Sequence, residues 1–252
     1  MKLFEQIKKL GEITGKSQSM GWVCDEAAFL LYSFAKIIRP EVVIQTGHLW
    51  GKGVVSILEG LHDGILDNPE VHSIGHATHF IQANRPPKSN PIVVSIDPAL
   101  DKRSIPGSEA GIAWLREHYP DFHFERKTAN DYFKQPNPYP GKRIMGVVDG
   151  DHAYLEALAD MEHLRDWGAE LIVIDDTTWL PHLTRLVHDF QRHNPQYTVL
   201  NLTLYNGVAI LWDETKRLSK PSPRSHLPKD FGERLYHWGL LGVARKVKNL
   251  WR

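Results

Sequence analysis

Acidic residues and a histidine follow an apolar segment in the stretch VVDGDHAYLEAL, which begins at Val147. Asp149 comes directly after the apolar residues, and His152 comes three positions later. A second apolar segment, ELIVIDD, ends in Asp175 and Asp176. Carboxylates that gather at one place repel one another unless they are protonated or neutralised by a hard cation such as Mg²⁺. A neutral imidazole beside such a cation is suited to general-base chemistry near neutral pH.

The predicted secondary structure brings these acids together. Residues 143–149 and 170–176 each begin with one charged residue and are then continuously apolar up to their acids, which is typical of parallel strands covered on both faces. A helix predicted for residues 152–167 joins them and has the length of a crossover between neighbouring strands. Since neighbouring strands lie about 4.8 Å apart, the carboxylates are expected at one edge of the sheet. The alternatives are an acidic rim neutralised by water alone and, for His152, a solvated position at the start of a helix.

Strand-like and helix-like segments alternate through most of the chain, and two strand-like segments at 197–212 flank Asn206-Gly207, a strong hairpin signal. This pattern predicts an α/β fold with a Rossmann-like, doubly wound and mostly parallel sheet, helices on both faces and an antiparallel terminal hairpin strand. The other predicted strands are 41–47, 91–97 and 122–126, and the other predicted helices are 22–38, 52–61, 107–119 and 182–193.

Three regions are expected: an N-terminal helical cap at 1–40, the main domain at 41–213, and a linker with a C-terminal amphipathic basic helix at 214–252. Packing on the core or across a dimer is favoured for that helix over attachment to an anionic membrane. A long polar connection spans residues 61–90, and its histidines match no strong zinc site. We expect this connection to be a loop over the cleft.

A glycine-containing segment, QTGHLWGKG, follows the first predicted strand. Gly47 and Gly51 allow the backbone to approach a ligand closely before a helix whose N-terminus favours anionic groups. Asp97 ends the second predicted strand, where it could accept hydrogen bonds from both hydroxyls of a ribose. Either feature alone is equally compatible with an ordinary turn, but together they favour a nucleoside site.

Four segments together resemble class I S-adenosylmethionine (SAM)-dependent methyltransferases: EVVIQTGHLWGKG, VVSIDP, VVDGDHAYLEALADME and GAELIVIDDTTW. The closest likeness is to metal-dependent small-molecule O-methyltransferases, including the catechol, caffeoyl-CoA and antibiotic-sugar enzymes. The resemblance covers about residues 41–212, and its most specific parts are DGDHAY and IDD. It implies an enzyme that moves the methyl group of SAM to a hydroxyl of a small molecule, with Mg²⁺ or another divalent cation as the second cofactor.

The resemblance also implies roles for individual residues. It assigns the metal to Asp149, Asp175 and Asp176, and the catalytic base to His152. The Gly47 turn would face the methionine part of the cofactor, Asp97 would bind the ribose, and the segment after the third strand would contact adenine. The implied cofactor-binding residues are Gln45, Thr46, Gly47, Gly51, Asp97, Asn130, Asp131 and Asp149.

The chain departs from the family pattern at Gln45, where an acid is usual. The glutamine amide can accept a hydrogen bond from the amino group of the cofactor but carries no charge, a difference of about 1–2 kcal/mol. Two other function classes stay open, and Gln45 is the main argument for the second of them. A metal-dependent hydrolase using the same acids predicts turnover without SAM. A non-catalytic scaffold or regulator with the SAM fold predicts cofactor binding without metal dependence.

Composition favours a soluble cytoplasmic protein. Lysine plus arginine equals aspartate plus glutamate at 30 each, so no net charge recruits nucleic acid. The single cysteine, Cys24, excludes an internal disulfide and fits a reducing compartment. No apolar run is long enough to cross a bilayer, and the first residues lack the apolar core of a signal peptide. The DGDH form favours a sugar or other polyhydroxylated acceptor, and a homo-oligomer is compatible with the sequence.

Overall fold

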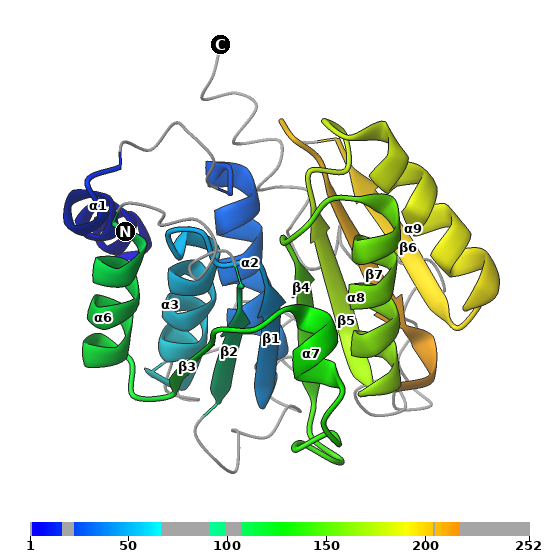
Figure 1. Cartoon of the computed structure of the whole chain (residues 1–252), viewed down its shortest axis with the longest axis horizontal. Helices are drawn as coiled ribbons and strands as arrows, with labels where there is room; N and C mark the ends of the chain where they lie inside the picture. Colours follow the sequence, from blue (N-terminus) through cyan, green and yellow to red (C-terminus); the bar gives the residue numbers. More distant parts are fainter. Residues whose placement is uncertain (1, 17–22, 67–90, 99–106, 204, 217–252) are drawn as a thin grey trace, which may run out of the picture. The chain divides into compact units, whose positions relative to one another are not determined.

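A seven-stranded sheet forms the centre of the computed structural model, which describes residues 2–16, 23–66, 91–98, 107–203 and 205–216 (Figure 1). The strand order is β3-β2-β1-β4-β5-β7-β6. The first five strands in this order pair in parallel, and β7 pairs antiparallel with both β5 and β6. The strands are β1 (Val42–Thr46), β2 (Ile92–Ile96), β3 (Phe122–Glu125), β4 (Ile144–Val148), β5 (Ala169–Asp175), β6 (Tyr197–Leu202) and β7 (Val208–Asp213).

Helices cover both faces of this sheet, because the central strands are apolar on both sides. Ile44, Val148 and Ile174 belong to the core beneath α8 (Tyr154–Asp166) and α9 (Pro181–His193). Figure 1 shows α8 in front of the sheet next to β5, and α8 packs against both β4 and β5. Alternate residues of the same strands, such as Val147, face the other side, beneath α2. The remaining helices are α1 (Lys2–Thr14), α2 (Asp25–Ile38), α3 (Lys52–Leu66), α6 (Ser108–His118) and α7 (Ala129–Phe133).

The predicted fold class is confirmed, including the antiparallel hairpin at the end of the sheet. The sheet reverses its order of growth between β1 and β4, so the carboxyl ends of these two strands form the switch point at which doubly wound proteins bind ligands. The crossover through α8 joins neighbouring strands, as the sequence predicted.

The structure differs from the sequence prediction at the end of one helix and by one additional helix. The helix after β1 continues to Leu66, so the first residues of the polar connection at 61–90 are helical, and residues 67–90 lie outside the described part. The sequence prediction missed α7, because five residues are too few to show an apolar period. Thr128 caps this helix by accepting a hydrogen bond from the amide of Asp131.

The predicted C-terminal helix also lies outside the described residues. Among those described, no helix has the length and apolarity needed to span a membrane.

Candidate functional site

The carboxyl ends of β1, β4 and β5 bring the predicted site residues to one edge of the sheet. The register aligns Gln45 of β1 with Val147 of β4, and Val147 with Val173 of β5. Asp149 follows β4 directly, and Asp175 is the last residue of β5. The acids therefore lie beside the glycine turn that follows β1.

The turn after β1 is built around Gly47, which has a φ of +83°. A Cβ atom at this position would lie 2.0 Å from the carbonyl oxygen of Asp149, so no other residue fits. The amide of Asp149 in turn donates to the carbonyl of Thr46 over 3.0 Å. Two loops of the switch point are therefore in direct backbone contact, and the contact requires glycine.

The side chain of Gln45 stabilises this turn through a hydrogen bond to its backbone. Its side chain is buried, with 1% exposure, and its Nε2 donates a hydrogen bond of 2.8 Å to the carbonyl oxygen of Gly47. Its Oε1 is buried and has no hydrogen-bond partner among the described residues. The amide therefore holds the turn with its donor and keeps one acceptor for another group.

Asp97 braces the next part of the same loop. Its Oδ2 accepts hydrogen bonds from the amides of His48 and Leu49, at 2.9 and 3.1 Å. The His48 imidazole is buried beside Ser95, and burial lowers its pKa to about 4. Gly51, with a φ of +87°, packs against that ring and closes the loop before α3. Asp97 thus already accepts hydrogen bonds from the loop that is predicted to surround the cofactor.

Three carboxylates lie close enough to affect one another. Asp175 and Asp176 are buried, and Asp149 is half-buried. Burial raises the pKa of Asp149 well above its usual range, and the negative charges of Asp175, Asp176 and Asp97 raise it further. Burial, followed by the charge of Asp176, raises the pKa of Asp175 to about 7, although Lys52 acts in the opposite direction. Burial and mutual repulsion disfavour the ionised form of these carboxylates, and a bound proton or cation would reduce that repulsion.

Two of these acids face α2. Asp149 and Asp175 line a cavity of about 10 Å³, which is close to the space needed by one water molecule, together with aliphatic side chains of α2, β4, β5 and β7. The Oδ1 atom of Asp175 is buried and has no hydrogen-bond partner within the described part of the chain. The third acid, Asp176, adopts a left-handed conformation with a φ of +61° and approaches His152.

His152 lies on the loop between β4 and α8. Its Nε2 is 3.7 Å from Oδ2 of Asp176 and has no hydrogen-bond partner in the described residues. Its backbone carbonyl is 2.7 Å from Nε2 of His182, a residue of α9, which fixes the loop. The neighbouring Asp151 is exposed and accepts a hydrogen bond from the amide of Ala153, so its role is to shape the turn.

The donor chemistry of the three acids fits a hard divalent cation, and the unpartnered Asp175 Oδ1 fits it as well. Their arrangement does not form a ready ligand group: across the described segments, no three or more His, Cys, Asp or Glu side chains are placed to hold one metal ion. A cation at this edge would therefore require side-chain movement.

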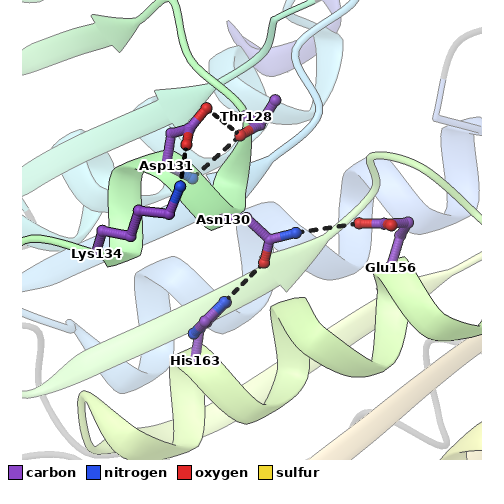
Figure 2. Close-up of polar contacts among 6 residues, drawn as sticks. All are labelled: Thr128, Asn130, Asp131, Lys134, Glu156 and His163. Atoms are coloured by element: carbon purple, nitrogen blue, oxygen red, sulfur yellow. Dashed lines mark hydrogen bonds and ion pairs between the residues drawn. The ribbon is translucent and has the colours of Figure 1, made fainter.

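Asn130 and Asp131, the predicted adenine contacts, lie on α7 and are exposed. Figure 2 shows both in contact with protein groups. Asn130 Nδ2 donates to Glu156 over 3.3 Å, and its Oδ1 is 2.9 Å from Nε2 of His163. Asp131 binds the hydroxyl of Thr128 and the ammonium group of Lys134. Asn130 thus links α7 to α8.

One buried acid near this edge was not singled out from the sequence. Asp160 lies on α8 with 6% exposure, beside Thr46. The available signal was its spacing, because it falls three residues after Ala157 and four before Leu164, both of which are buried. A carboxylate at a core position of a helix indicates a specific partner.

No protein-family model matches the chain, and no curated protein sequence matches it. Solved structures do match. An O-methyltransferase from Bacillus cereus in complex with SAH has a TM-score of 0.57 at 12% identity, with 84% of this chain and 91% of that one covered. For the O-methyltransferase TomG from Streptomyces achromogenes, in complex with SAM, the TM-score is 0.55 at 14% identity, with coverage of 84% and 90%. The SAH-bound methyltransferase PaMTH1 from Podospora anserina gives 0.54 at 13% identity, with coverage of 83% and 87%. The chain therefore has the Rossmann-like fold of these methyltransferases over most of its length.

Proposed function

We propose that this protein is a SAM-dependent O-methyltransferase that acts on a hydroxyl group of a small molecule. The observation that carries the proposal is the meeting of two features at one sheet edge: the Gly47 turn braced by Asp97, and the acids with His152. Solved proteins with this fold hold SAM or SAH. The two features supply a place for a nucleoside-bearing methyl donor and, beside it, groups for activating an acceptor.

The cofactor would lie over the turn from Thr46 to Gly51. The Gly47 backbone allows close approach, and the unpartnered Oε1 of Gln45 offers an acceptor for an ammonium group. A ribose hydroxyl would donate to Asp97, which also accepts hydrogen bonds from the amides of His48 and Leu49. Because Asn130 is engaged by α8, an adenine contact there would require a rearranged side chain.

His152 would take the proton from the acceptor hydroxyl. Its Nε2 faces Asp176 without a hydrogen bond of its own, so it can receive a proton whose charge the carboxylate then stabilises. The acceptor oxygen forms a bond to the methyl carbon as the carbon–sulfur bond breaks, and the sulfonium becomes a neutral thioether. Alignment of the two substrates supplies much of the remaining rate enhancement.

Asp149, Asp175 and Asp176 would hold Mg²⁺ or another divalent cation. When bound, such a cation lowers the pKa of a hydroxyl group placed against it. The charges of Asp175 and Asp176 add to burial in raising the pKa of Asp149, and the charge of Asp176 adds to burial in raising that of Asp175, which favours a bound cation electrostatically. Their side chains must close around it, since they are not arranged as a ligand group in the described structure.

We propose a sugar or another polyhydroxylated molecule as the acceptor. Trp179 is 68% exposed and Tyr205 is 80% exposed, and both lie on the loops that border Asp176. These loops are joined because the amides of Thr178 and Trp179 donate to the carbonyl of Asn206. Exposed aromatic side chains beside carboxylates and imidazoles offer apolar surface and hydrogen bonds together, which suits a ring bearing several hydroxyls.

Calorimetric titration of the purified protein with SAH, with and without Mg²⁺, tests the proposal first. Micromolar binding is expected, and an acceptor screen with sugars and catechols should then show methyl transfer that EDTA abolishes. Binding that is unaffected by metal, with no transfer to any acceptor, would instead indicate a non-catalytic scaffold. Turnover of a nucleoside-like ligand without SAM would indicate a hydrolase. An absence of SAH binding in both conditions would overturn the proposed function.

A further inference from the structure

The chain has one extra residue where it leaves β5. Up to Asp175 the strands β5 and β7 pair in regular register, and Asp175 lies opposite Val208. The amide of Thr177 then donates to the carbonyl of Gly207 over 3.2 Å. Gly207 and Val208 are consecutive, whereas Asp176 stands between Asp175 and Thr177. Asp176 is therefore the additional residue, as in a β-bulge, and a bulge can redirect a side chain next to a functional site.

The backbone of Asp176 is left-handed, with a φ of +61°. This conformation costs free energy for a residue with a Cβ atom, although aspartate tolerates it better than most, so it persists where the surrounding contacts impose it. It accompanies a position in which Oδ2 of Asp176 lies 3.7 Å from Nε2 of His152. The contacts that impose this backbone therefore also place a carboxylate of the site.

The turn between β6 and β7 holds the segment that follows Asp176. The carbonyl of Asn206 accepts hydrogen bonds from the amides of Thr178 and Trp179, at 2.7 and 2.8 Å. Gly207 has a φ of +86°, and a Cβ atom there would lie 2.2 Å from the amide nitrogen of Thr178 and 2.2 Å from its Oγ1. Three successive amides thus bond to two successive carbonyls of the turn, and only glycine allows this approach.

Helix α9 contacts the same segment and is the competing explanation for the backbone of Asp176. The Thr184 hydroxyl donates to the carbonyl of Thr177, and the amide of Leu180 donates to the carbonyl of Asp176 over 2.9 Å. These bonds hold Asp176 only on its carboxyl side. The hairpin holds both neighbours of Asp176, through the pairing of Asp175 and through the amide of Thr177. The contacts on both sides favour the hairpin.

We propose that the Asn206-Gly207 turn is a positioning element: it imposes the left-handed backbone of Asp176 and thereby fixes the carboxylate of this residue beside His152. The importance of that placement for a metal-assisted reaction rests on the proposed function. The contact between the turn and the segment after Asp176 does not, because it is made within the protein.

A comparison of glycine and alanine at position 176 tests the imposed backbone. Asp176→Gly and Asp176→Ala both remove the carboxylate and so differ in backbone preference. With Gly207 intact, Asp176→Gly should have a folding equilibrium constant about five-fold larger, because glycine adopts the left-handed conformation without steric cost. With Gly207→Ala added, the order should reverse, to about two-fold in favour of alanine, whose unfolded chain has less conformational entropy to lose. Urea denaturation of the four variants measures both preferences.

Thr184→Val is the control background, since it removes a bond to the same segment from α9 and leaves the turn intact. The preference for glycine at position 176 should remain in it. A preference that survives Gly207→Ala, or that disappears in Thr184→Val, would overturn the proposal in favour of α9. If Gly207→Ala does not fold, hydrogen exchange of the unaltered protein decides: the amides of residues 177–179 should exchange at least about a hundred-fold more slowly than in an unstructured peptide. Fast exchange there would overturn the proposal.

Calorimetric titration of the ligand-free protein with Mn²⁺ links the turn to the site. Gly207→Ala is expected to bind Mn²⁺ about ten-fold more weakly, because Asp176 no longer presents its carboxylate beside the other acids. SAH affinity should not change, since the Gly47 turn is left intact. Gly141→Ala is the matched control, with a φ of +74° and no atom within 4 Å of its Cβ position, and should change neither affinity.

The outcomes separate the positioning role from the proposed function. If the unaltered protein binds no Mn²⁺, the proposed metal role fails, whereas the comparison at position 176 still decides whether the turn imposes the backbone. If Gly207→Ala binds Mn²⁺ as tightly as the unaltered protein does, the turn does not position a carboxylate of the site, and that part of the inference is overturned.

Discussion

The side-chain amide of Gln45 donates to the carbonyl of Gly47 over 2.8 Å, two residues along the same chain. A glutamate at this position could accept a hydrogen bond from a cofactor ammonium group, but it could not donate to that carbonyl. The departure from the family pattern at Gln45 therefore has a structural counterpart: the residue holds the turn, and its remaining acceptor is left for a ligand.

Gln45→Glu should destabilise the ligand-free protein by about 1–3 kcal/mol, because a buried donor is lost and a carboxylate is brought against a carbonyl oxygen. Chemical denaturation measures the change. The control is Gln191→Glu, which removes a 3.2 Å bond from Nε2 to the carbonyl of Tyr197 at a half-buried position where water can compensate, so its effect should be smaller. Equal stability of Gln45→Glu and the unaltered protein would show that the bond to Gly47 is not needed.

Gly47→Ala should prevent stable folding or lower the free energy of unfolding by several kcal/mol. The added Cβ would meet the Asp149 carbonyl at 2.0 Å, and the positive φ adds strain. Gly141→Ala is the matched control, since Gly141 has a φ of +74° but no atom within 4 Å of its Cβ position, and it should cost only about 1–2 kcal/mol. Thermal unfolding of the two variants measures the difference. Similar losses would show that backbone strain, and not the contact between the loops, is what matters.

Asp175→Asn should stabilise the protein in a pH-dependent way. The folded-state pKa of about 7 lies above the ordinary 3.8, so ionising Asp175 weakens the fold progressively as pH rises from about 4 to 7. The variant should therefore be more stable than the unaltered protein above pH 7, by roughly 1–4 kcal/mol, and the difference should vanish below pH 4. Urea denaturation at several pH values measures it.

Asp189→Asn should change the stability of the protein in the opposite direction and serves as the control for Asp175→Asn. Its hydrogen bond from Tyr154 and its ion pairs with Arg185 and Arg192 lower the pKa of Asp189, so its stabilisation is present at neutral pH and lost as the solution becomes acidic. This variant should be less stable than the unaltered protein at pH 7. If Asp175→Asn also proved less stable at pH 8, the electrostatic account of the acid cluster would be wrong.

His152→Ala should reduce methyl transfer by about 100-fold or more while SAH affinity stays within two-fold, because the imidazole is expected to act on the acceptor and not on the cofactor. Initial rates and calorimetry measure the two effects. His188→Ala, an exposed position on α9, should leave both unchanged. Full activity of His152→Ala would remove the histidine from the mechanism and leave the proton to another group or to water.

The sequence predicted the strands well because their apolar runs are continuous and end at acids or glycines. It also placed β4 and β5 side by side, because the length of the segment between them allows a single crossover. The end of α3 was harder to predict, since Leu61 to Leu66 include His62 and Asp63, which weaken the apolar period. Tertiary packing, and not local pattern, decides such boundaries.

The Gly47 turn, the three acids and His152 lie at one edge of the sheet, but the sequence could not show which hydrogen bonds the predicted site residues make within the protein. Asp97 accepts two loop amides, and Asn130 bridges to α8, both of which are three-dimensional contacts. Asp160 was missed because a single charge in a helix is usually solvated. Residue type and spacing thus predict where groups gather, whereas burial and partner choice require coordinates.

The position of β7 between β5 and β6 has a consequence for the growing polypeptide on the ribosome. The outer edge of β5 pairs with residues 208–213, which are synthesised more than thirty residues after β5 itself. Until they emerge, Leu171 to Ile174 present an unpaired apolar edge, the kind of surface that recruits strands from other chains. Translation that stalls after α9 would leave a nascent chain with this edge uncovered, so completion of the hairpin is also the step that protects the sheet from aggregation.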